Sequence, residues 1–189
     1  MELILASGSP RRRELLERIG LREFSVCPAD IQEVIPESAP PEEVVMALSA
    51  QKARWVADAH PEGLILAADT VVSLDGDILG KPRDEGDARE MLRRLSGRSH
   101  SVYTGLTLRR GAEQATEYEH TQVSFRTLSD GEIDAYIASG EPMDKAGAYG
   151  VQGLGALFVT GILGDYYNVM GLPLCRLGRM LKGFGVTVL

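Results

Sequence analysis

A largely apolar run in the first half of the chain precedes a hairpin signal. Residues 64–74 have the sequence LILAADTVVSL, and this Val- and Ile-containing run predicts a strand buried on both faces. Asp75-Gly76 is typical of a hairpin turn, and the return run ends at Gly80-Lys81-Pro82. Asp69 interrupts the apolar run, and a buried carboxylate requires a partner. The pattern leaves two interpretations open: a salt-bridged structural Asp69, or a functional acid with a lysine nearby.

The N-terminal pattern predicts a strand followed at once by a helix. Residues 2–7 predict a short strand, and Ser9-Pro10 supplies an N-cap and a proline at the first helical position. Three arginines at positions 11–13 occupy the first helical turn, where the helix dipole disfavours cations. Free N–H groups and guanidinium groups together suit phosphate. An anion site is therefore favoured, with a solvated basic patch as the alternative.

The rest of the chain alternates between helical and extended periodicities. Strands are predicted at residues 22–28, 99–109, 113–125, 157–163 and 186–189, and helices at 42–59, 85–96, 130–139 and 173–184. A turn at Arg110-Gly111 joins the two longest strands antiparallel. Asp84 is the predicted cap of the helix at 85–96, and Ser129 with Glu132 has capping-box spacing before the helix at 130–139. The glycine-rich stretch 142–155 has neither period and predicts a loop that a ligand can approach closely. We therefore expect one domain over residues 1–189, of the α/β class, with a mixed sheet flanked by helices rather than a purely parallel one.

Composition and charge narrow the classes of partner. The 189 residues are 44% hydrophobic and 25% charged, which is ordinary for a soluble globular protein. The net charge of −7 predicts no general affinity for nucleic acid or for an acidic membrane, so an anion site must be built locally. Residues 146–164 carry no charge, but their six glycines argue against a membrane span and predict a glycine-rich loop followed by a buried strand.

Cysteine usage and the N-terminus favour the cytoplasm. Cys27 and Cys175 have no metal-binding spacing, and two thiols make no disulfide framework. They are expected to be small core residues in a reducing compartment. A strand pattern follows Met1 at once, without the features of a signal peptide.

Several common sites are excluded by their motifs. Lys81 is followed by proline, so no P-loop is present, and the three histidines lack zinc spacing. The remaining candidates are basic residues that could bind phosphate and carboxylates that could bind a hard cation. The candidate phosphate partners are Arg11, Arg12, Arg13, Lys52, Lys81 and Lys145, and the candidate ligands of a cation such as Mg²⁺ are Asp30, Glu33 and Asp69. This inventory suggests metal-assisted attack on phosphorus, although the helical pattern alone places Lys52 on a solvated face.

At this point the motifs resemble those of the Maf family. The resemblance is carried by LASGSPRR at the N-terminus, AADT in the central strand, GKP at 80–82, GR-x-H-x-VYTG at 97–105, T-x-V-x-F at 121–125, SGEP-x-DKAGAYG-x-QG at 139–153 and GDYYNVMGLPL at 164–174. The blocks stand in family order over nearly the whole chain. Met170, where valine is commoner, is one small departure.

The resemblance implies a nucleoside triphosphate pyrophosphatase. Maf proteins split a nucleotide into its monophosphate and pyrophosphate with a divalent cation, and so act on nucleotide pools. Their fold is similar to that of the inosine triphosphate pyrophosphatases: two lobes on a mixed sheet, with the active site in the cleft. The resemblance further implies a cytoplasmic homodimer, with an association with arrest of septum formation and cell division.

Three positions distinguish two branches of that family. The branch that acts on dTTP and UTP has Arg, Thr and Gln where the 7-methyl-GTP branch tends to have Trp, Gln and Glu. Modified pyrimidine nucleotides are further candidate substrates of the first branch. This chain has Arg11, Thr70 and Gln152 at those positions, so it resembles the pyrimidine branch. A glutamine amide offers both a donor and an acceptor, which suits the edge of uracil or thymine.

The resemblance also implies the remaining roles. Asp69 is expected to accept the proton of the attacking water and, with Glu33, to hold the metal. Phosphates are expected to bind Ser7, Arg12, Lys52 and Lys81. Two alternatives stay open: a 7-methyl-GTP pyrophosphatase, and a nucleotide-binding regulator of septation with little turnover.

Overall fold

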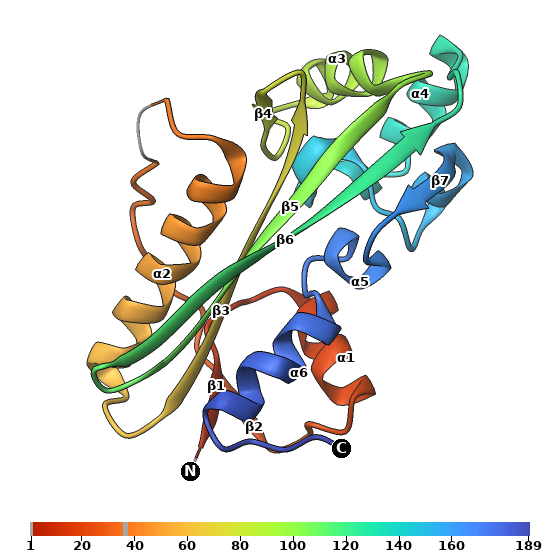
Figure 1. The fold of residues 1–189 in the computed structure, drawn as a ribbon. Helices are drawn as coiled ribbons and strands as arrows, with labels where there is room; N and C mark the ends of the chain where they lie inside the picture. Colours follow the sequence, from red (N-terminus) through yellow and green to blue (C-terminus); the bar gives the residue numbers. More distant parts are fainter. Residues whose placement is uncertain (1, 36–37) are drawn as a thin grey trace.

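The sheet runs diagonally through the whole molecule (Figure 1). A computed structural model describes residues 2–35 and 38–189, and within them the sheet has seven strands in the order β2-β1-β3-β5-β6-β7, with β4 beside β3. The strands are β1 (Leu3–Leu5), β2 (Phe24–Val26), β3 (Leu64–Leu74), β4 (Asp77–Leu79), β5 (Ser99–Arg110), β6 (Glu113–Phe125) and β7 (Val159–Leu163). The α-helices are α1 (Pro10–Arg18), α2 (Pro41–Ala59), α3 (Glu85–Leu95), α4 (Asp130–Ala138), α5 (Tyr166–Val169) and α6 (Leu174–Gly183).

The sheet is mixed, as predicted. Strands β2, β1 and β3 are parallel to one another, whereas β3 pairs antiparallel with β4 and β5, and β5 with β6. The predicted turns at Asp75-Gly76 and Arg110-Gly111 both join antiparallel strands, and Asp75, Gly76 and Gly111 adopt positive φ. The predicted α/β class with a mixed sheet and flanking helices is confirmed.

Alternate residues of β1 and β3 supply two separate cores, which explains their continuous apolar sequence. Leu3, Leu5, Leu64 and Leu66 pack on one face with side chains of α1 and α6. The residues between them belong to the cluster on the other face, beneath α2. These are Ile4, Ala6, Ile65 and Ala67, packed with Ala53 and Val56. Burial on both faces is typical of parallel strands covered by helices.

Helix α2 lies directly on the central strands. A Cβ atom at Gly105 of β5 would collide with the backbone of Val45, so only glycine permits this approach. Beyond this helix, α3 and α4 cover the far end of the sheet with a third core that includes Leu92, Phe125 and Ile133 (Figure 1). The caps predicted for these two helices are present. The Asp84 side chain accepts from the Asp87 N–H, and Ser129 forms a capping box with Glu132.

Strand β3 loses its neighbour on one side over its central residues. Its pairing with β1 ends at Leu66, and its pairing with β4 begins at Val72. Between these points, residues 67–71 have no strand partner on that side within the described part of the chain. Asp69 and Thr70 lie in this bare stretch, and their side chains alternate between the two faces of the sheet. This edge also lies beyond the carboxyl end of β1, where α/β sheets place their ligands.

Three predictions about the last third of the chain were wrong. Strand β7 is an exposed edge strand rather than a buried one, since Leu163 is 75% exposed. Val186–Leu189 is not a strand: Val186 and Val188 pack against the core beside α6, so their alternation reflects burial and not strand pairing. Cys175, expected in the core, is exposed. The predicted loop at 142–155 is irregular apart from short 3₁₀ turns, η1 (Glu141–Asp144), η2 (Ala146–Ala148) and the start of η3 (Leu154–Phe158). In the described residues, no helix is long and apolar enough to cross a membrane.

Candidate active site

A cleft of about 720 Å³ opens at the bare stretch of β3. Its walls come from the end of β1, the start of α1, one side of α2 and the segment 144–153. The nine residues to which the family resemblance assigns a role all line this cleft: Ser7, Arg11, Arg12, Glu33, Lys52, Asp69, Thr70, Lys81 and Gln152. The structure therefore brings together residues that are scattered over most of the sequence.

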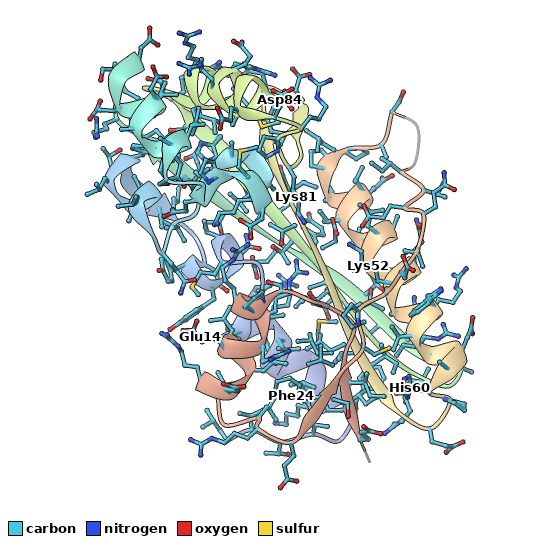
Figure 2. All side chains as sticks on the ribbon, turned by 180° about the vertical axis from the view of Figure 1, so that it is seen from behind. Glu14, Phe24, Lys52, His60, Lys81 and Asp84 are labelled. Atoms are coloured by element: carbon cyan, nitrogen blue, oxygen red, sulfur yellow. The ribbon has the colours of Figure 1, made fainter. Side chains whose placement is uncertain are left out.

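Asp69 is paired with Lys52 in the wall of the cleft beneath α2. The Lys52 ammonium donates to Oδ1 of Asp69 and lies 2.8 Å from Oε1 of Glu33. The side chains of Asp69 and Lys52 are only 13% and 16% exposed, so each largely desolvated charge has its required counter-ion. The helical pattern had placed Lys52 on a solvated face, which was wrong, because this face of α2 turns toward β3. In Figure 2, Lys52 and Lys81 lie in the middle of the molecule, between α3 and α1.

The loop that carries Glu33 is attached to α2 by Gln51. The Val34 N–H donates to Gln51 Oε1 at 3.0 Å, and Gln51 Nε2 donates to the Val34 carbonyl at 2.7 Å. Gln51 precedes Lys52, so adjacent residues of α2 hold the backbone of the loop and its carboxylate. The sequence analysis did not identify Gln51, because a polar residue on a helix gives no signal of a distant loop.

Arg12 forms the floor of the cleft on the opposite face of the sheet. Its Nε donates to the Gly171 carbonyl at 2.8 Å, its Nη1 to Ser7 Oγ at 3.1 Å and its Nη2 to Thr70 Oγ1 at 3.1 Å. Burial lowers the pKa of Arg12, although the Asp69 charge opposes this, and a guanidinium stays protonated nonetheless. These three hydrogen bonds leave two guanidinium N–H groups of Arg12 available to an anion.

The residues around Arg12 contribute unequally to the predicted anion site. Ser7 Oγ accepts from the Ser9 N–H as well as from Arg12, so its own proton can be donated into the cleft. Arg11 lines the cleft and lies 4.0 Å from the Asp144 carboxylate. Arg13 is exposed and lies outside the cleft lining. The solvated alternative therefore fits Arg13, whereas the anion-site prediction fits Arg11 and Arg12.

The far wall of the cleft supplies lysines and the amide of Gln152. Lys81 is exposed and makes no ion pair with any described residue. Lys145 donates to the Glu141 carbonyl and to Asp144 Oδ1, both at 2.6 Å, so it is already engaged. Gln152 is exposed at the cleft, and within the described residues its amide forms no hydrogen bond. It is therefore available to a ligand.

The carboxylates that could hold a metal are Glu33 and Asp69. Asp30, also considered from the sequence, lies outside the cleft lining. Within the described chain no group of three or more His, Cys, Asp or Glu residues is arranged to hold an ion. Glu33 and Asp69 nevertheless contact the same Lys52 nitrogen, so their oxygens converge on one cationic group. Two carboxylates fit Mg²⁺ or Mn²⁺, since such a cation completes its shell with water and substrate phosphate.

Two buried aromatic residues behind the cleft, His100 and Tyr149, were also not predicted from the sequence. The Tyr149 hydroxyl lies 2.7 Å from His100 Nε2, and Tyr149 reaches the cleft wall. Burial lowers the pKa of His100 to about 4 and raises the pKa of Tyr149. Both residues are therefore neutral near pH 7, and their role is to support the wall. Altogether, the cleft offers a carboxylate that can accept a proton, beside cations that can bind phosphate.

Known proteins match this chain in sequence and in fold. The profile of the family described as Maf-like protein matches residues 2–184. A protein of Bacillus cytotoxicus named dTTP/UTP pyrophosphatase is 52% identical over 183 residues, covering 97% of this chain and 95% of its own. A protein of the same name from Bacillus cereus is 50% identical over 187 residues, covering 99% and 97%.

The similar solved structures are more distant in sequence. The Ham1 protein of Staphylococcus aureus has a TM-score of 0.55 at 14% identity, covering 97% of this chain and 100% of its own. A HAM1 protein from Coxiella burnetii gives the same TM-score at 16% identity, covering 97% and 99%. These structures show the fold alone, and they agree with the predicted α/β class. The match of the family profile over residues 2–184 shows that the chain belongs to the Maf-like protein family.

Proposed function

We propose that this protein hydrolyses dTTP and UTP to the monophosphate and pyrophosphate. One observation carries the proposal: a chain half identical to proteins named dTTP/UTP pyrophosphatase has a carboxylate, several cations and a free amide in one cleft. The cleft volume of about 720 Å³ is within the range of small-ligand sites.

Asp69 is the proposed proton acceptor. A water molecule beside it attacks the α-phosphorus and passes a proton to the carboxylate. The bond from the α-phosphorus to its bridging oxygen breaks, and pyrophosphate leaves with the electron pair. Lys52 supports this role because its ammonium donates to Oδ1 of Asp69 and so orients the carboxylate.

Phosphate binding is assigned to Ser7, Arg12, Lys52 and Lys81. Arg12 is held in place by three protein acceptors, so it can bind a phosphate oxygen with little loss of side-chain freedom. The exposed Lys81 can move toward the outer phosphates. Such charges act most strongly where negative charge develops during the reaction.

A divalent cation is part of the proposal. Glu33 and Asp69 would hold it, and it would neutralise negative charge on the triphosphate. Lys52, which now contacts both carboxylates, would then be free to turn toward the phosphates.

Recognition of the nucleobase is assigned to Gln152, and Arg11 lines the same cleft. The free amide of Gln152 can donate to one atom of the uracil or thymine edge and accept from the next. Thr70, the third branch indicator, lies in the floor and contacts Arg12 rather than facing Gln152. A homodimer, a cytoplasmic location and a link to cell division come from the family resemblance and stay predictions.

The test is pyrophosphate release from dTTP, UTP and 7-methyl-GTP, measured side by side with Mg²⁺ and with Mn²⁺. The proposal predicts the highest kcat/KM for dTTP and UTP. A preference for 7-methyl-GTP would assign the chain to the other branch. Tight binding of all three without turnover would instead favour a nucleotide-binding regulator.

A further inference from the structure

The loop that carries Gln152 is held at both ends by two residues outside the cleft lining. On one side, the Gly150 N–H donates to the Tyr136 hydroxyl at 3.0 Å. On the other side, the Leu154 N–H donates to Oε2 of Glu141 at 2.8 Å, and the Gly155 N–H to Oε1 at 3.2 Å. Neither Tyr136 nor Glu141 lines the cleft. Gln152 therefore lies at the middle of a short loop whose two ends are fixed from behind.

The two supporting side chains also bind each other. The Tyr136 hydroxyl donates to Oε1 of Glu141 at 2.8 Å. Burial raises the pKa of Tyr136, so its hydroxyl keeps the proton that it donates. Burial also favours the neutral form of Glu141, but the N–H groups of Leu154 and Gly155 and the Tyr136 hydroxyl outweigh it and lower its pKa. An ionised carboxylate, which only accepts, matches these three donors.

The loop fits closely around this pair. A Cβ atom at Gly153 would collide with the Glu141 carboxylate, and one at Gly155 would lie 2.5 Å from the Gly150 carbonyl oxygen and 2.9 Å from the Tyr136 hydroxyl. Glycine is therefore required at position 153 by the supporting carboxylate, and at position 155 by the loop backbone together with the hydroxyl. Tyr136 is itself 3% exposed and packs edge-on against Phe158, so the support is rigid.

We propose that Glu141 and Tyr136 are positioning residues that set base discrimination by fixing the loop that presents Gln152. This inference rests on the proposed function, in which Gln152 binds the base edge. An amide distinguishes one edge from another only when its donor and acceptor are held in place. Discrimination by hydrogen bonds is large because the wrong base leaves a polar group unpaired.

The experiment compares Glu141→Gln and Tyr136→Phe in the wild-type and Gln152→Ala backgrounds. Glu141→Gln keeps the shape but turns an NH₂ group toward backbone N–H donors, and Tyr136→Phe keeps the buried ring. The readout is the ratio of kcat/KM for UTP to kcat/KM for CTP. The bases of these two nucleotides are similar in size but differ in the hydrogen-bonding groups on their edges. We expect each substitution to lower the ratio about tenfold when Gln152 is present, and less than twofold in Gln152→Ala.

Glu132→Gln is the matched control. Glu132 is a hydrogen-bonded carboxylate on the neighbouring helix α4, where it contacts Ser129 and Arg126 and not the loop. Its substitution is expected to lower stability and leave the ratio unchanged. An unchanged ratio in Glu141→Gln, or an equal fall in the Gln152→Ala background, would overturn the inference.

Amide hydrogen exchange provides a readout that requires no nucleotide. Glu141→Gln should speed exchange at Leu154 and Gly155, and Tyr136→Phe at Gly150, with rates elsewhere unchanged. A wild-type protein that does not turn over UTP contradicts the proposed function rather than the support of the loop. In that case the exchange rates alone test whether Glu141 and Tyr136 support the loop, and unchanged rates in Glu141→Gln overturn the inference.

Discussion

Arg12 Nη2 donates a hydrogen bond of 3.1 Å to the hydroxyl of Thr70, 58 residues further along the chain. Thr70 Oγ1 lies 2.8 Å from Thr104 Oγ1, and Thr104 donates to the Asn168 carbonyl at 3.2 Å. Since Thr70 accepts from Arg12 and Thr104 donates onward, Thr70 gives its own proton to Thr104. This threonine therefore connects the arginine in the floor of the cleft to the centre of the sheet.

We predict that Thr70→Val raises KM for dTTP and UTP alike, by about tenfold. A hydrogen bond to a charged group contributes roughly 1.5–3 kcal/mol, and about 1.4 kcal/mol corresponds to a tenfold change. Steady-state kinetics with both nucleotides would measure the effect. Thr107→Val, the same change at a buried threonine outside the cleft lining, is the control. If Thr70→Val altered the ranking of dTTP, UTP and 7-methyl-GTP at constant KM, Thr70 would act on the base instead.

Lys52→Met should strengthen the binding of Mn²⁺ to the nucleotide-free protein, by about tenfold. The substitution removes the ammonium and leaves Glu33 and Asp69 without their shared counter-ion, so the two carboxylates attract a divalent cation more strongly. Titration calorimetry would measure both affinities. Adding Glu33→Gln to Lys52→Met should reverse the gain. Equal Mn²⁺ affinity in the wild type and Lys52→Met would show that these carboxylates do not hold the metal.

Gln152→Glu should change the order of substrates. An ionised carboxylate only accepts hydrogen bonds, so it suits a base edge that presents donors and disfavours uracil and thymine. The measurement is kcat/KM for dTTP, UTP and 7-methyl-GTP in parallel assays. Gln122→Glu, the same charge change at an exposed position on β6 outside the cleft lining, controls for net charge. An unaltered order in Gln152→Glu would mean that this amide does not recognise the base.

Stability is expected to fall between pH 7.5 and pH 5 because of His100. Burial lowers its pKa from 6.5 to about 4, so in this range the unfolded chain binds a proton that the folded protein does not. Stability from this group is complete above pH 6.5 and is lost as the pH falls toward 4, by about 2 kcal/mol at pH 5. Urea unfolding of the wild type and His100→Gln at both pH values would measure the difference.

His120→Gln is the control for that comparison, because His120 is exposed on β6. It should retain the wild-type pH dependence. A wild-type slope that persists in His100→Gln would assign the acid sensitivity to other groups.

Local signals in the sequence predicted much of the fold. Asp75-Gly76 identified the hairpin of β3 and β4, and Ser129 with Glu132 identified the start of α4, because turns and caps depend on adjacent residues. The strand predicted at Val186–Leu189 failed because alternation reports burial, whereas a strand also requires a neighbour with a free edge. The predicted burial of the strand that ends at Leu163 failed for a related reason: an apolar run does not show whether another element covers it.

The site was predicted less from spacing than from the family motifs. The helix dipole argument placed an anion near the arginines at 11–13, but it could not show that Arg12 turns inward while Arg13 stays exposed. Lys52 was misplaced by its helical pattern, because the depth of a charged side chain depends on a partner from another strand. Glu141 was missed because two of its three donors are backbone N–H groups, which leave no signal in the sequence.

Asp69→Asn tests the central claim most directly. The asparagine keeps the size of the side chain but cannot accept the proton of water, so pyrophosphate release from UTP should fall by several orders of magnitude. Circular dichroism and a thermal melt would establish that the variant is folded. The measurement is kcat for pyrophosphate release by wild type and Asp69→Asn at saturating UTP with Mg²⁺ or Mn²⁺. We predict rapid release by the wild type and almost none by the folded variant, whereas near-normal release by Asp69→Asn would contradict the account.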